Sequence, residues 1–163
     1  MGSERTASDG SQVASYEADE RFLLVNTGHL RCALPTAMVR QVVRSLSLYP
    51  VPGSQPHLLG LAQFAGEPLA VLDLHALVTD GVPGSAHRAT VILGRAPEST
   101  GRVVGFAVDE AVGVSVLQVS EDHREGSSIL TATATFEGHT VRVVDPSLLF
   151  SEDWKPGLGG SDG

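Results

Sequence analysis

The feature that most constrains the fold of this chain is an internal repeat of 13 residues. Residues 66–78 read GEPLAVLDLHALV, and residues 138–150, lying 72 positions later, read GHTVRVVDPSLLF. Identical residues stand in register with no gap at four positions: Gly66 and Gly138, Val71 and Val143, Asp73 and Asp145, Leu77 and Leu149. Self-similarity at a fixed spacing is the signature of a duplicated structural unit. The chain is therefore expected to contain two halves of like design.

Each copy of the repeat predicts a turn, a strand and a short helix. Glycine and its polar neighbours form the turn, and an alternating apolar run such as TVRVV forms the strand. Asp73 and Asp145 then stand where a helix N-cap accepts backbone N–H bonds. Pro146 follows Asp145 at the first helical position that proline favours. We expect both halves to close a small β-barrel with this unit, and both aspartates to be structural.

The remaining body of the chain predicts further short strands. Turn signals recur about every ten residues between positions 21 and 150, and the apolar segments between them are short and β-branched. A hairpin is predicted around Asn26-Thr27-Gly28. Pro35 followed by Met38, Val39 and Val42 predicts a short amphipathic helix. Residues 1–20 and 151–163 are expected to be flexible tails flanking one folded domain at 21–150.

Charge and composition narrow the classes of partner. The formal net charge is −8 and the sequence pI is about 5.1, so nucleic acid backbones and anionic lipid surfaces would be repelled. No apolar run approaches the roughly 18 residues that span a bilayer. We therefore expect protein partners, no nucleic acid, no membrane insertion and a cytoplasmic location.

Catalytic, cofactor and metal sites are not predicted. Cys32 alternates with Leu30 and Leu34 on one strand face, which favours core packing over nucleophilic chemistry. The six histidines lack the spacing of familiar metal sites. A small β-barrel enzyme or ligand carrier remains the alternative, and it would require a pocket lined by Cys32 or Asp73. Trp154 is open to two interpretations, as an anchor for a partner or as a residue docked on its own barrel.

Four separated motifs resemble the CheW family of bacterial chemosensory coupling proteins. They are a hairpin ending in ALP with the following AMVRQVV, then LLGLAQFAGEPLAVLDL, VVGFAVDEAVGV and VRVVDPSLLF. They occur in the family's order and cover residues 21–150. The resemblance implies a mainly β fold, with two intertwined five-stranded SH3-like β-barrel subdomains around a shared hydrophobic core and short helices. It also implies no enzymatic activity and no cofactor.

The resemblance further implies a role and a set of contact residues. Family members are adaptors that couple the cytoplasmic tip of a chemoreceptor to the regulatory domain of a CheA-type histidine kinase, in the cytoplasm or recruited to membrane-associated or polar signalling clusters. Val39 and Val42 fall where the family presents an apolar groove to the receptor. The partner-binding residues implied are Val39, Gln41, Val42, Leu58, Gly60, Ala65, Gly66, Val104 and Val108.

Two of these positions depart from the family pattern. The family usually has Glu at the position of Gln41 and Arg at the position of Ala65. The loss of a guanidinium matters because arginine makes fork-shaped contacts that alanine cannot replace. A second hypothesis is therefore a divergent adaptor of a non-chemotactic pathway, in motility or polarity regulation, that no longer binds receptors.

Overall fold

The computed structural model describes residues 20–84, 86–94, 103–121 and 129–150, and the chain is mainly β. Its elements are β1 (Arg21–Thr27), β2 (Leu30–Pro35), η2 (Thr36–Met38), β3 (Val39–Arg44), β4 (Leu58–Phe64), β5 (Glu67–Asp73), α2 (Leu74–Val78), β6 (Ala89–Gly94), β7 (Val103–Val108), β8 (Glu110–Val116), β9 (Val119–Glu121), β10 (Leu130–Phe136), β11 (His139–Val144) and η3 (Pro146–Phe150). The strands form two sheets, ordered β8-β1-β2-β11-β10-β9 and β3-β6-β7-β5-β4.

The two copies of the repeat form the same turn and strand, as predicted, but the short helix that follows is the α-helix α2 in the first copy and the 3-10 helix η3 in the second. β4 and β10 begin hairpins in which the burial of successive side chains follows the same sequence, and both hairpins have a register shift near their start. The amide of Asp73 donates to the carbonyl of His57 over 2.8 Å, and the amide of Asp145 donates to the carbonyl of Ile129 over the same distance. The second pair lies 72 residues after the first, which is the spacing of the repeat.

The duplication extends beyond the repeat motif. β5 pairs in parallel with β7, and β11 pairs in parallel with β2. In the first pairing, Ala70 of the first half stands opposite Val104 of the second half. In the second pairing, Arg142 of the second half stands opposite Cys32 of the first half. Each half therefore pairs with a strand that comes from the other half. β3 and β8 are equivalent in the same way, since each is an edge strand antiparallel to the first strand of the other half.

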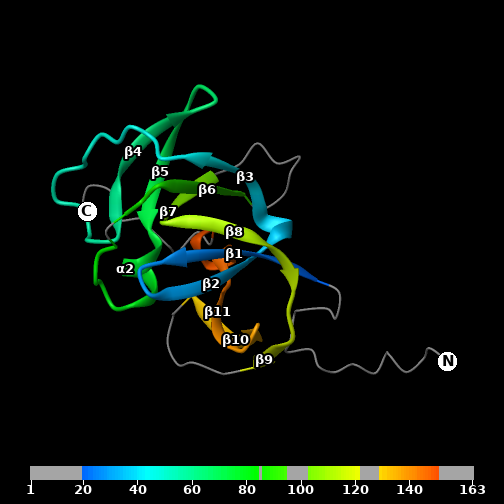
Figure 1. Cartoon of the computed structure of the whole chain (residues 1–163). Coiled ribbons are helices and arrows are strands. Elements are labelled where there is room, and N and C mark those ends of the chain that lie inside the picture. The colour runs from blue at the N-terminus through cyan, green and yellow to red at the C-terminus, as the bar shows by residue number, and fades with distance from the viewer. Residues whose placement is uncertain (1–19, 85, 95–102, 122–128, 151–163) are drawn as a thin grey trace.

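Each sheet is therefore built from both halves of the chain. β1 and β2 join β8–β11 in one sheet, whereas β3–β5 join β6 and β7 in the other, and Figure 1 shows the two groups of strands side by side. Exchange of this kind makes the two SH3-like barrel subdomains intertwined, as the family resemblance implied. The mainly β fold class is confirmed.

The hydrophobic core has one shared cluster and two smaller clusters. The shared cluster draws buried side chains from both sheets and from the helical turns, including Leu34, Leu72, Phe106, Val144 and Leu149. Each smaller cluster fills one barrel, around Phe22 and Val143 in the first and around Ile92 and Val71 in the second. Burial of apolar surface between the barrels stabilises their association at about 25 cal/mol per Å².

The helix predicted for PTAMVRQVV, residues 35–43, is wrong beyond its first turn. Thr36–Met38 form a single 3-10 turn, and Val39–Arg44 continue as strand β3. The apolar residues at helical spacing include two valines whose β-branched side chains also suit a strand. Pairing with β6, about fifty residues further along the chain, decides between the two structures.

The ends of the chain lie largely outside the described residues. The expected tails at 1–20 and 151–163 fall there except for Glu20, and so does Trp154. The division into two tails and a domain at 21–150 stays a prediction.

Candidate partner-binding surfaces

The predicted contact residues of the apolar groove lie on the edge strand β3. Val39 is half-buried and packs against the shared core cluster, so it connects the core to the surface. Gln41 is exposed, and the relative solvent-accessible surface of Val42 is 40%, which is high for a valine. A register shift between Val39 and Gln41 bends this strand where it leaves the 3-10 turn.

The β4–β5 hairpin carries four of the predicted residues, but only its tip is at the surface. Ala65 and Gly66 form the exposed two-residue turn, with φ angles of 53° and 82° that fit a type I′ turn. Leu58 is buried in the shared core. Gly60 is also buried, with φ at 155°, and a Cβ there would stand 2.7 Å from the carbonyl oxygen of Tyr49.

Val104 and Val108 lie in the middle of the molecule. Both are buried on β7 within the shared core cluster, at 2% and 0% exposure. Their side chains therefore pack in the core that the two barrels share, and so does the side chain of Leu58. Among the predicted residues, Gln41, Val42, Ala65 and Gly66 are exposed and Val39 is half-buried. They fall in two groups, because β3 and the β4–β5 hairpin stand at opposite ends of the order β3-β6-β7-β5-β4.

A second exposed apolar strand was not identified from the sequence. β8 is the edge strand equivalent to β3, and its three alternate valines are 44%, 55% and 46% exposed: Val112, Val114 and Val116. The alternation in EAVGVSV predicts a strand, but nothing in the sequence says that its apolar face would be left uncovered. Two edge strands of unlike chemistry thus stand at equivalent places in the two halves.

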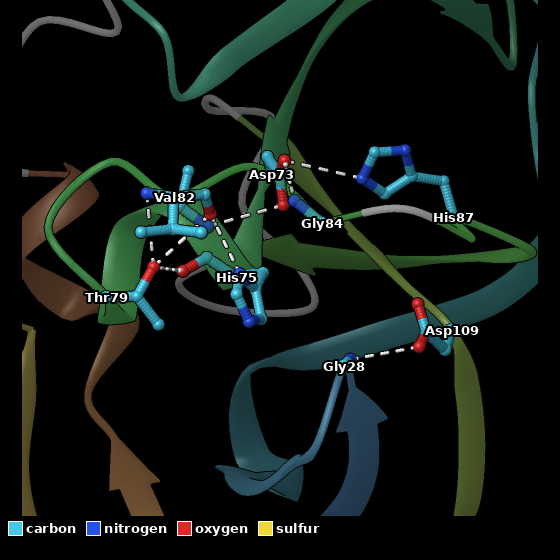
Figure 2. Close-up of polar contacts among 9 residues, drawn as sticks. Gly28, Asp73, His75, Thr79, Val82, Gly84, His87 and Asp109 are labelled. Atoms are coloured by element: carbon cyan, nitrogen blue, oxygen red, sulfur yellow. Dashed lines mark hydrogen bonds and ion pairs between the residues drawn. The ribbon is translucent and has the colours of Figure 1, made fainter.

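Asp73 is buried and organises the loop that follows α2, as Figure 2 shows. Its Oδ1 accepts the amide N–H of Ala76 over 3.3 Å, which is the predicted N-cap, and its Oδ2 accepts the amide N–H of Gly84 over 2.8 Å. The Nε2 atom of His87 lies 3.4 Å from the same Oδ2. Asp145 also caps its helical turn, through the amide and hydroxyl of Ser147, and within the described ranges its side chain accepts from no second loop.

Asp109 ties the two sheets together. It stands between β7 and β8, and its Oδ2 accepts the amide N–H of Gly28 in the β1–β2 turn over 2.9 Å (Figure 2). Its own amide donates to the carbonyl of Asn26 over 2.9 Å. Gly28 has a φ of 64°, which confirms the predicted hairpin turn, and a Cβ there would collide with the ring of His75. This aspartate therefore has a structural explanation.

Cys32 packs in the shared core, as predicted. The side chain has 0% exposure, and burial raises the pKa of its thiol to about 12, against a smaller opposing effect of Arg142. A thiol that stays protonated and covered is a poor nucleophile. Within the described ranges, no three histidine, cysteine or acidic side chains are grouped so as to hold a metal ion.

The comparisons with known proteins agree with this architecture. The CheW-like domain family matches residues 21–153. The protein FrzA of Myxococcus xanthus is 28% identical over 116 residues, which cover 71% of this chain and 70% of FrzA. The crystal structure of the scaffolding protein TtCheW of Thermoanaerobacter tengcongensis superposes with a TM-score of 0.69 at 16% identity, covering 85% of this chain and 97% of that one. The chain therefore belongs to the CheW-like domain family.

Proposed function

We propose that the chain is a non-catalytic adaptor of bacterial chemosensory signalling, which couples a chemoreceptor tip to the regulatory domain of a CheA-type histidine kinase. Membership of the CheW-like domain family supports this proposal, together with the exposure of Val42 on the edge strand β3. No helix among the described residues is long and apolar enough to cross a membrane. We place the protein in the cytoplasm, where receptor tips and kinases meet, with recruitment to membrane-associated or polar clusters through its partners.

The proposed mechanism needs no bond-making by this chain. An adaptor changes the output of a kinase only by binding its active and inactive arrangements with different affinity. The rigid connection between the barrels suits this task, because it fixes the geometry of two bound proteins relative to each other. The proposed contact surface comprises Val39, Gln41 and Val42 on β3 and the turn Ala65-Gly66.

The test is binding of purified protein to a receptor tip fragment and, separately, to a kinase regulatory domain of the same organism. We expect both to bind, and we expect Val42→Asp to weaken capture at least about tenfold because a charge would be buried in an apolar contact. Thr140→Asp is the matched control, since it places the same charge on an exposed strand residue of the other sheet. Failure of both fragments to bind the wild-type chain would refute the proposal.

A second candidate function has a specific observation in its favour. Gln41 and Ala65 lack the carboxylate and guanidinium usual in the family, and both are exposed where a partner would meet them. An adaptor of a non-chemotactic pathway that has lost receptor binding is therefore proposed as the alternative. Capture of the kinase domain without capture of any receptor tip would favour it.

A further inference from the structure

The segment from Arg21 to Gly66 has no acidic residue, although the whole chain has 19 acidic residues and a net charge of −8. Its arginines are Arg21, Arg31, Arg40 and Arg44. The last two lie on β3, which is one of the two edge strands of its sheet. Two of the four arginines of this acid-free segment thus lie on an edge strand.

One corner of this edge carries two arginines without an acidic partner. Arg44 ends β3 and is exposed, and the amide of the next residue, Ser45, donates to the carbonyl of Arg88 over 3.1 Å. Arg88 is also exposed. Within the described part of the chain, neither guanidinium lies within ion-pair distance of a carboxylate. Arg40 is exposed too, and its guanidinium extends over Gly94 of the neighbouring strand.

The other half of the duplicated fold has no arginine at the places of Arg44 and Arg88. Arg44 stands opposite Ala89 in one barrel, and the equivalent pair in the other barrel is Val116 opposite Arg21. Val116 therefore occupies the place of Arg44, and Glu20, which precedes Arg21, occupies the place of Arg88. The two positions thus hold a valine and a glutamate in the other barrel, so the strand pairing itself does not require arginine at either of them.

We propose that the β3 edge binds an extended, acidic segment of a partner protein, which adds as a strand beside β3. The unpaired side of an edge strand offers backbone N–H and C=O groups to an added strand. A carboxylate opposite Arg44 and an apolar residue opposite Val42 would match the side chains along the edge. The inference rests on the proposed adaptor function and specifies the chemistry of the segment that the adaptor recognises.

Charge complementarity decides between this partner and a second copy of the chain. A second copy would offer its own β3 edge, and that edge has no carboxylate to place opposite Arg44, because residues 21–66 contain no acidic residue. An acidic strand places a carboxylate there, and opposite charges on neighbouring strands attract. The negative charge of the rest of the molecule adds specificity, because it repels acidic segments from other surfaces.

The test uses a synthetic probe, the peptide acetyl-Thr-Glu-Thr-Val-Thr-Glu-Thr-amide, titrated into the full ¹⁵N-labelled chain. We expect amide shifts concentrated at residues 39–44, and binding at least about fivefold weaker in 300 mM than in 50 mM NaCl, since salt screens exposed pairs. Arg44→Glu should weaken binding at least about fivefold, and Val116→Glu, the same change at the equivalent place, should stay within about twofold of wild type. A peptide with Gln in place of both Glu should bind at least about fivefold more weakly.

Four results would overturn the proposal. Three are shifts absent from β3, equal binding of the Glu and Gln peptides, and equal binding by wild type and Arg44→Glu. The fourth is peptide binding that appears only when the five acidic residues among positions 1–20 are changed to Asn or Gln, which would assign the edge to the chain's own N-terminal segment instead. None of these results depends on a kinase or receptor fragment, so the adaptor function is tested separately.

Discussion

At the residue scale, Asp73 and Asp145 show that equivalent residues of the two repeat copies can contribute differently to the stability of the fold. Both carboxylates cap a helical turn, but Asp73 is fully buried and also holds Gly84 and the ring of His87. We expect Asp145→Ala to lower the free energy of unfolding by about 1 kcal/mol, which is the usual cost of losing a cap. Asp73→Ala should cost about 3 kcal/mol, because it also leaves the Gly84 amide without its acceptor. Urea unfolding of the two variants measures the difference, and equal losses would contradict it.

His57 gives the residue scale a second prediction, on pH. Burial lowers the pKa of His57, so its folded-state pKa lies below the value in the unfolded chain. The unfolded state then binds more protons as the pH falls below about 6.5, and the stability that neutral His57 provides is lost through that window. As the pH falls from 7.5 to 5.5, we expect the free energy of unfolding to decrease less in His57→Gln than in the wild type. The same decrease in wild type and variant would show that other groups control this pH dependence.

At the element scale, the two repeat hairpins have turns of the same geometry. Ala65 and Gly66 have φ angles of 53° and 82°, and Glu137 and Gly138 have φ angles of 52° and 80°. A Cβ at either glycine meets no atom of the described residues within 4 Å, so the cost of alanine there comes from the left-handed backbone conformation. We expect Gly66→Ala and Gly138→Ala each to cost about 1 kcal/mol. The double variant should show the sum, because the two turns are distant. Thermal melts of the three variants would expose any difference between the hairpins.

The elements also show where sequence reasoning succeeds and where it stops. The hairpin at Gly28 and the capped turns after Asp73 and Asp145 depend on residues within a few positions of each other, and all three are confirmed. β3 was predicted as helix because its strand pairing depends on residues about fifty positions away. The burial of Val104 and Val108 could not be predicted either, since a matching motif does not distinguish a core strand from a contact surface. The exposed valines of β8 were missed for the same reason.

At the scale of the whole molecule, the exchange of strands means that each sheet needs both halves of the chain. Neither half of the chain holds a complete sheet, because β1 and β2 need β11 while β6 and β7 need β5. The shared core cluster adds apolar contacts from both sheets to this exchange. An adaptor that fixes two bound proteins relative to each other benefits from such a connection, since a flexible hinge between the barrels would uncouple the two contacts.

This connection predicts that the barrels unfold together. We expect a single calorimetric transition, with calorimetric and van't Hoff enthalpies equal, as two-state unfolding requires. Val144→Ala removes buried volume from the shared core, and it should lower the stability of both barrels equally, by about 1 to 3 kcal/mol. Hydrogen exchange of the slowest amides in β6 and in β10 measures this, because exchange through global unfolding gives every such amide the same free energy. Loss of protection in β10 alone would mean that the barrels unfold separately, and the proposed rigid coupling would then lack its physical basis.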